Sequence, residues 1–473
     1  MDVEYVFVAL AIDRFYSIAI RALGVKRVGG NISMARGSLK LGRGVGALGV
    51  VLAAIAAGSG WGQDIERAPI HYSTAARHNP VETLRERLES GKQSLAFDAR
   101  LGYLPAVLRA LDIPESSQVL VFSKTSLQRE RISPATPRAL YFNDDVLIGF
   151  CQGGRVLEMS AADPAVGTAF YTLDQSRSKA PAPVRQTESC LLCHSSSANQ
   201  GMPGHLVRSL YIDHRGNPML AAGSFRTDHT SPIAERWGGW YVTGTSGRQK
   251  HMGNMIREES SRPRSSDNSE GVNVVDLSSR ITTADYLTPH SDIVALMVLE
   301  HQAGMLNRLA RASLETQMAL DYERDLNKAL GRPLGERSES TLSRIHGVGD
   351  AVVEYMLFTD EARLTDPIKG TSTFAVDFAR RGRRDSQGRS LRDLDLKTRL
   401  FRYPCSFLIE SRAFDTLPAL VKDYILKRLW EILNGRENPK DGPSAGDRAA
   451  ILRILLETKP DLPDYWKTTT SRR

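Results

Sequence analysis

The chain has 473 residues, of which 41% are hydrophobic and 25% are charged, an ordinary composition for a globular protein. This length is enough for one large domain or for two to three smaller ones. The formal net charge of +8 falls to about +4 without residues 1–62, which carry seven Lys and Arg against three Asp and Glu. So weak a positive charge on the mature protein does not indicate a nucleic-acid partner, and we expect none.

The N-terminal residues contain a predicted secretory signal peptide over about residues 34–62. Met34 is followed by a basic segment, by a 14-residue uncharged apolar run over residues 45–58 and by small residues. The run is shorter than the roughly 20 residues that cross a bilayer, so we expect cleavage and no integral membrane span in the mature chain, with an uncleaved anchor as the alternative. Residues 1–33 do not resemble a signal, and we interpret them as an artefactual extension upstream of Met34.

Residues 63–175 are expected to form an N-terminal α+β region. Two short helices are predicted, over residues 80–88, where Pro80 suits the first helical position, and over residues 103–111. Apolar runs separated by turn residues then predict a small antiparallel β-meander. Its strands are expected over residues 119–122, 139–142, 146–151, 155–159 and 167–173. The polar, proline-containing residues 175–186 are expected to form a loop.

The most specific pattern in the chain is Cys190-Leu191-Leu192-Cys193-His194. Each thiol at this spacing can add across one vinyl group of a haem, and the adjoining imidazole can bind the iron. The alternatives are a disulfide loop, half of a zinc site and a Cys-x-x-Cys redox pair. A zinc site needs a second pair of closely spaced ligands and a redox pair sits in a βαβ unit, and the sequence indicates neither. We therefore predict covalent haem attachment at Cys190 and Cys193, with His194 as an axial ligand.

This motif resembles the attachment motif of the c-type cytochromes, and the resemblance covers these five residues. It implies one covalent haem c, a periplasmic location reached through the signal peptide, and redox partner proteins. The predicted function is therefore electron transfer by a periplasmic monohaem c-type cytochrome with large non-cytochrome additions. The alternative is a haem c-dependent, peroxidase-like oxidoreductase whose additional regions build a substrate pocket, although dihaem peroxidases carry two such motifs. A third interpretation is a structural exported protein with a vestigial haem.

The haem c-binding region is expected over residues 176–280 and a helical C-terminal region over residues 281–473. Within the first, a strand over residues 206–212 is expected to pair back with residues 218–225. The aromatic, glycine-rich residues 237–244 either line the haem or fill the core. Helical periodicity then predicts a central helix over residues 291–320, a weaker helix and connector over 325–349, and amphipathic helices over 417–433 and 449–457. The predicted fold class is α+β, with a cytochrome c-like haem region preceded by the β-meander and followed by a helix-rich half.

The sixth ligand of the iron is not fixed by the motif. Candidates downstream are Met202, His205, Met219, His229, His251, Met252 and Met255. Met252 is favoured because it lies 58 residues after His194 in an expected loop between glycines, as the methionine ligand of class I cytochromes c does. His251 and His229 come next, and an open iron site is the remaining possibility.

Two further observations are left with alternatives. His301 lies beside Glu300 in the middle of a predicted helix, where it acts as a general acid or base or, more commonly, is a hydrogen-bonded core histidine. Cys151 and Cys405 either form a disulfide in an oxidising compartment or remain two buried thiols.

Overall fold

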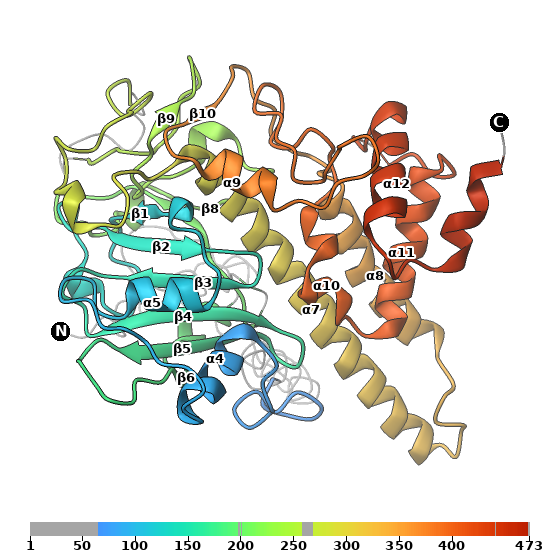
Figure 1. Ribbon diagram of the computed structural model, residues 1–473. Helices are drawn as coiled ribbons and strands as arrows, with labels where there is room; N and C mark the ends of the chain where they lie inside the picture. The colour runs from blue at the N-terminus through green and yellow to red at the C-terminus, as the bar shows by residue number, and fades with distance from the viewer. Residues whose placement is uncertain (1–64, 197–198, 200, 258–267, 440, 472–473) are drawn as a thin grey trace, which may run out of the picture. The chain divides into compact units, whose positions relative to one another are not determined.

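The computed structural model describes residues 65–196, 199, 201–257, 268–439 and 441–471. The predicted signal peptide and the start at Met34 lie outside these residues. The described residues belong to one compact unit that begins at Gly60. Figure 1 shows its mixed α and β structure, with an antiparallel sheet in the first part and helices in the C-terminal half, as predicted. The region boundaries expected near residues 175 and 280 stay predictions.

Six strands form one antiparallel sheet in which each strand pairs with the next along the chain. They are β1 (Val119–Val121), β2 (Arg138–Phe142), β3 (Val146–Phe150), β4 (Val156–Asp163), β5 (Gly167–Asp174) and β6 (Val184–Gln186). The predicted meander is confirmed over β1 to β5. The prediction of a loop throughout residues 175–186 is wrong at its end, because Gln186 of β6 pairs with Phe170 of β5. β6 is an edge strand with half-buried or exposed side chains, so it lacks the apolar alternation that would have revealed it.

One face of the sheet packs against two short helices, α4 (Pro80–Glu89) and α5 (Leu104–Ala110), which lie in front of it in Figure 1. A continuous row of buried side chains crosses this face, because alternate residues of a strand point to the same side. The row is made of Tyr141, Ile148, Met159 and Tyr171, which are cross-strand neighbours on β2 to β5. Both predicted helices are confirmed, and Asn79 caps α4 by accepting the Glu82 amide at 3.0 Å.

The opposite face is covered in part by α7 (Ile293–Ala329), a helix of 37 residues. It contacts β4 and β5 on one side and α8 (Glu339–Met356) on the other. Buried residues surround its first half, since Leu296, Val298 and Met305 are all below 1% exposed. A helix that is apolar on several sides belongs in a core, so the predicted central helix is confirmed.

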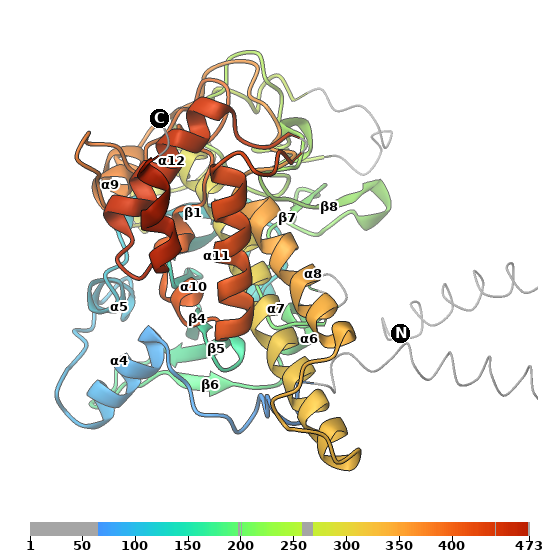
Figure 2. The same ribbon diagram turned by 90° about the vertical axis from the view of Figure 1, so that its right-hand side faces the viewer.

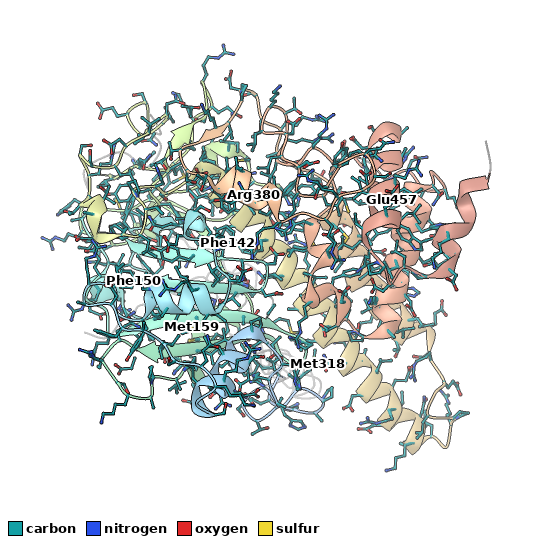
Figure 3. The ribbon with its side chains drawn as sticks, in the orientation of Figure 1. Phe142, Phe150, Met159, Met318, Arg380 and Glu457 are labelled. Carbon is teal, nitrogen blue, oxygen red and sulfur yellow. The ribbon has the colours of Figure 1, made fainter. Side chains whose placement is uncertain are left out.

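The remaining helices build the C-terminal half around α8. They are α9 (Phe374–Arg380), α10 (Arg412–Asp415), α11 (Ala419–Leu433) and α12 (Ala445–Thr458), and α11 packs between α8 and α12. The weaker helix expected over residues 325–349 is divided between the end of α7, a connector and α8. Figure 3 places Phe142 of β2 where the sheet meets this half, and its ring lies 5.6 Å from that of Phe374 on α9.

Residues 176–280 contain short elements. The predicted pairing after the motif is confirmed in shortened form by β7 (Arg208–Leu210) and β8 (Ser224–Arg226), and β9 (Gly244–Thr245) pairs with β10 (Lys369–Gly370) from the C-terminal half. The described residues also contain short helical turns. They are α6 (Leu191–His194) and the 3-10 turns η2 (Glu115–Ser117), η3 (Arg129–Arg131), η5 (Leu220–Ala222), η6 (Ile233–Glu235), η7 (Thr283–Asp285) and η8 (Phe407–Glu410). A longer 3-10 segment, η9 (Asp464–Ser471), follows α12. Among the helices of the described residues, none combines the length and the apolar character that crossing a membrane requires.

Asp292 fixes the start of the central helix. Its carboxylate accepts the amides of Val294 at 2.8 Å and Ala295 at 3.3 Å, and its other oxygen accepts the amides of Thr371 at 2.9 Å and Ser372 at 2.8 Å. The side chain is buried, so these donors have no access to water as a substitute. One carboxylate therefore caps α7 and ties it to the loop that follows β10.

We expect Asp292→Ala to lower the free energy of unfolding by roughly 2–4 kcal/mol, because a cap and several charge-assisted hydrogen bonds are lost together. Urea denaturation measures the change. Ser338→Ala removes an ordinary cap, the bond to the Thr341 amide on α8, and is the control, with a loss of about 1 kcal/mol. Equal losses in the two variants would contradict the tie between α7 and the loop.

Candidate functional site

The two thiols and the imidazole of the motif lie on one short turn. Cys190 precedes α6, and its carbonyl accepts the amides of Cys193 at 3.3 Å and His194 at 3.0 Å. Cys193 is exposed, Cys190 and His194 are half-buried, and Leu192 is 81% exposed. Both thiols are free. Figure 2 labels α6 in the lower part of the molecule. The motif lies at the surface, and its connection to α7 runs through the loop at Gly204 and His205.

The His194 ring is held in one orientation by the backbone. Its Nδ1 lies 2.8 Å from the carbonyl oxygen of Gly204, and its ring centroid lies 4.8 Å from that of Phe170 on β5. A carbonyl oxygen only accepts, so Nδ1 carries the proton and Nε2 carries the lone pair. Burial lowers the pKa of His194, which keeps the ring neutral at pH 7. Metal-ligating histidines share this arrangement, in which the second nitrogen donates to a backbone carbonyl.

A second layer of contacts fixes the Gly204 carbonyl from α7. Asn307 accepts the His205 amide at 2.7 Å and donates to the His205 carbonyl at 2.8 Å. Asn199 donates to the His194 carbonyl at 3.0 Å, and the Gly204 amide donates to the same oxygen at 3.0 Å. A Cβ on Gly204 would collide with Asn307 Oδ1, so only glycine allows this close approach. The side chain of Asn307 thus holds the loop that orients the motif histidine.

A charged pair on the sheet lies close to the motif. Arg138 of β2 and Glu158 of β4 form an ion pair of 2.5 Å across Gly149 of β3. Both charges act on the titration of Cys190 and of His194. Burial first, and then the Glu158 carboxylate, raises the pKa of the Cys190 thiol, which stays protonated at neutral pH.

Two of the favoured sixth-ligand candidates are adjacent core residues. Met252 is 2% exposed, and its Sδ accepts a hydrogen bond from Ser209 Oγ at 3.6 Å. His251 is 3% exposed, its Nδ1 accepts the Gly253 amide at 3.1 Å, and its ring meets Trp237 edge-on at 5.1 Å. In the described part of the chain, no hydrogen bond or ring contact of either residue involves His194. Their ligation of the iron stays a prediction.

The third favoured candidate, His229, belongs to a buried histidine pair. Its Nδ1 lies 2.8 Å from Nδ1 of His301, and its ring stacks on Phe358 at 4.5 Å. His301 is fully buried, and its Nε2 lies 2.8 Å from Ser406 Oγ. Both nitrogens of His301 are therefore hydrogen-bonded, as expected for a core histidine. Its neighbour Glu300 forms a buried ion pair of 3.2 Å with Arg236.

The other sixth-ligand candidates have separate surroundings. His205 is buried, with Nε2 3.0 Å from Ser160 Oγ on β4, and it follows the glycine that binds His194. Met202 is buried in the hydrophobic cluster that also contains α4 and α5. The Met219 amide donates to the Tyr211 carbonyl at 2.8 Å, beside the β7–β8 hairpin. Met255 is half-buried.

The aromatic residues and the remaining cysteines belong to the core. Trp237, Trp240 and Tyr241 are at most 5% exposed and pack in the two hydrophobic clusters of the unit. Cys151 and Cys405 are both buried free thiols, so the disulfide alternative does not hold in this structure. Burial raises the pKa of Cys151 to about 11, which makes this thiol unreactive at neutral pH.

Sequence reasoning missed the residues that support the motif. Gly204 and Asn307 were not singled out, because an isolated glycine and an asparagine within a helix carry no local pattern that indicates their role. In the described residues, no group of three or more His, Cys, Asp or Glu side chains is placed to hold a metal ion directly. Comparison of the chain with family models, curated proteins and solved structures gives no match.

We expect Asn307→Leu to loosen the loop from Asn199 to His205, because two backbone groups of His205 lose their partners. Hydrogen exchange of peptides covering residues 201–206 measures the effect, and an exchange at least about fivefold faster is expected, since one lost hydrogen bond of about 1–1.5 kcal/mol corresponds to a factor of roughly 5 to 13. Gln317→Leu is the matched control, because the hydrogen bond of the Gln317 side-chain amide among the described residues goes to Ser313 within α7. Equal exchange in both variants would contradict the role of Asn307.

Buried histidines predict a loss of stability in acid. Burial lowers the pKa of His251 to about 4, whereas an unfolded histidine titrates near 6.5. As the pH falls below about 6.5, the unfolded chain binds the proton first, so the contribution of His251 to stability is lost between about pH 6.5 and 4. We expect the unfolding free energy of His251→Gln to fall less steeply than that of the wild type as the pH falls across this window. The two slopes should differ by about 1.4 kcal/mol per pH unit. Equal slopes for the variant and the wild type, measured by urea denaturation, would refute this.

Proposed function

We propose that this chain is an exported, periplasmic c-type cytochrome with one haem c. Cys190 and Cys193 hold the haem covalently, and His194 is an axial ligand of its iron. The observation that carries the proposal is the hydrogen bond from His194 Nδ1 to the Gly204 carbonyl. This bond leaves the Nε2 lone pair available to a metal, on the same turn as two free thiols. The zinc alternative would need two more ligands at a second short spacing, and the sequence indicates no such pair.

Each residue of the motif has a distinct task in this proposal. The bound haem supplies one-electron redox chemistry at its iron. The two thioether bonds would keep the haem on the chain. The Gly204 carbonyl fixes the orientation of the imidazole and makes its Nε2 a more basic metal ligand. The exposure of Cys193 and Leu192 opens this part of the surface to redox partner proteins, and electron transfer with them is the proposed function.

We assign the haem c-binding region to residues 176–280, between the N-terminal region over residues 63–175 and the helical region over residues 281–473. We limit the proposed likeness to a cytochrome c to the turn that carries the motif. In the described part of this region, the one α-helix is α6, and the other elements are short strands and 3-10 turns. Loops and the neighbouring sheet face would therefore enclose the haem.

The alternative function is a haem c-dependent oxidoreductase with its own substrate pocket. A cavity of about 190 Å³ does lie in the described structure, and α7 and α8 supply part of its wall. Its lining includes Asn199, His205 and Asn307, which hold the loop whose Gly204 carbonyl accepts from His194 Nδ1. The iron would bind the other ring nitrogen, Nε2. A molecule in this cavity would be separated from the iron by the imidazole, so the geometry favours the electron carrier.

We expect the chain, made in the periplasm alongside a haem-attachment apparatus, to gain the mass of one haem and to show c-type absorption in a pyridine haemochrome assay. Cys190→Ser with Cys193→Ser removes both effects, because no thioether can form. Cys151→Ser is the control, since this buried thiol lies outside the motif and the variant keeps its haem. A colourless wild-type protein of bare polypeptide mass would overturn the proposal.

The same preparation separates carrier from enzyme through its reduced-minus-oxidised spectrum with and without carbon monoxide. A carrier has a low-spin iron that does not bind carbon monoxide, and an enzyme has a high-spin iron that does. Alanine variants of Met252, His251 and His229 then test the sixth ligand, because only the variant that removes the ligand shifts the Soret band and the reduction potential.

A further inference from the structure

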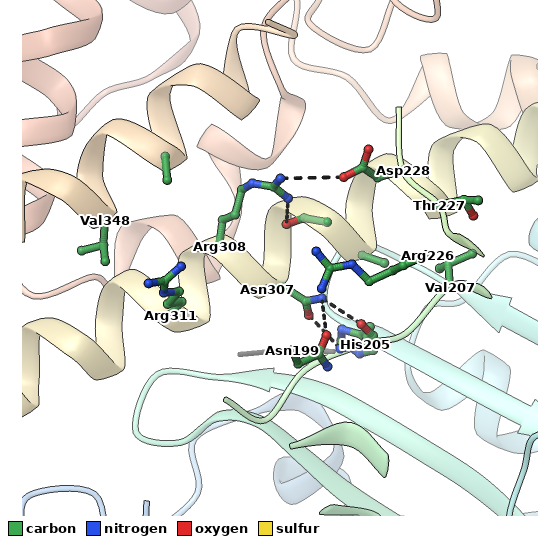
Figure 4. Close-up of a pocket in the computed structure, with 13 residues that line it drawn as sticks. Asn199, His205, Val207, Arg226, Thr227, Asp228, Asn307, Arg308, Arg311 and Val348 are labelled. Atoms are coloured by element: carbon green, nitrogen blue, oxygen red, sulfur yellow. Dashed lines mark hydrogen bonds and ion pairs between the residues drawn. The ribbon is translucent and has the colours of Figure 1, made fainter. Parts of the chain in front are cut away.

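The cavity behind the motif has the size of a small-molecule site. It lies between α7 and the segment that runs from Asn199 to Asp228, as Figure 4 shows. Its volume is about 190 Å³, somewhat more than the 150 Å³ or so of a cavity that takes up benzene. It therefore has room for a ligand of about six to eight non-hydrogen atoms.

Positive charge predominates around this cavity. Three arginines line it, Arg226, Arg308 and Arg311, against one carboxylate, that of Asp228. Arg311 forms an ion pair of 2.6 Å with Glu315, and Arg308 forms one of 3.7 Å with Asp228. Asp228 is the one carboxylate among the lining residues, so positive charge still predominates there and favours an anion.

The Arg308 guanidinium is held in place with most of its donors unused. Its plane lies 3.6 Å from the centre of the Tyr355 ring, and Nη1 donates to the Gly304 carbonyl at 3.0 Å. In the described part of the chain, that is its one hydrogen bond, although a guanidinium has five N–H donors. A fixed, planar fork of this kind is suited to a carboxylate, which accepts two parallel hydrogen bonds.

A buried histidine also lines the cavity. His205 is 5% exposed, and its Nε2 lies 3.0 Å from Ser160 Oγ on β4. This bond fixes the ring that forms part of the cavity wall.

Part of the wall is aliphatic. Val207, Ala303, Val348 and Ala351 line the cavity, and Figure 4 shows Val348 at the end beyond Arg308 and Arg311. Such a wall favours a ligand with a short hydrocarbon tail over a wholly polar anion such as phosphate.

We propose that this cavity binds a small organic carboxylate with a short aliphatic tail. The carboxylate meets Arg308, and the tail lies against Val348 and Ala351. The site is formed by the polypeptide alone and does not depend on the haem proposed for Cys190 and Cys193, so a failure of one proposal leaves the other standing.

Isothermal titration calorimetry on the purified mature chain tests the proposal, with or without its haem. 3-Methylbutanoate is the probe, its neutral counterpart 3-methylbutanamide lacks the charge, and inorganic phosphate lacks the tail. We expect the carboxylate to bind at least tenfold more tightly than either. Arg308→Gln lowers this affinity at least tenfold, and Ala351→Phe abolishes binding by filling the cavity.

Arg324→Gln is the matched control, because Arg324 also lies on α7 but forms an ion pair with Asp321 outside the cavity. We expect the affinity of this variant for 3-methylbutanoate to equal that of the wild type. Circular dichroism melting shows that each variant is folded. The proposal is overturned if the carboxylate releases no heat, if phosphate or the amide binds as tightly, or if folded Arg308→Gln binds like the wild type.

Discussion

The hydrogen bond between Nδ1 of His194 and the Gly204 carbonyl is the interaction on which the candidate site depends. It decides which nitrogen of the imidazole bears a proton, and so which nitrogen keeps the lone pair that can bind a metal. The carbonyl is useful only if it stays in place, and Asn307 keeps it there through two bonds to the next residue. The chemistry of a surface turn is thus set by a side chain of the most buried helix.

That helix combines two kinds of stabilisation. Its apolar residues pack between the sheet and α8. Several of its polar residues form hydrogen bonds or ion pairs inside the core, as His301 does with Ser406 and Glu300 does with Arg236. Burial raises the pKa of Glu300 to about 7, and the Arg236 charge opposes this shift. Such partners are costly to remove singly, because the remaining group would be left buried without one. The polar core therefore specifies how α7 lies against its neighbours.

Local patterns were sufficient for most of the fold. The start of α4 at Pro80, the strands β1 to β5 and the central helix follow from capping residues and from periods of two and 3.6 residues, which depend on near neighbours only. β6 escaped because an edge strand with exposed side chains has no apolar alternation. The motif from Cys190 to His194 was recognisable from its spacing alone. The residues that support it were not, because Gly204 and Asn307 meet across about a hundred residues and neither belongs to a local pattern. The sixth ligand of the proposed haem iron would depend in the same way on long-range packing, which a single sequence does not encode in any readable period.

The exposure of Cys193 bears on how such a protein would mature. The Cys193 side chain is exposed in the folded chain, whereas Cys190 is half-buried. If a haem is attached as proposed, the Cys193 thiol would therefore be open to the reaction after folding, whereas the Cys190 thiol would first have to be uncovered.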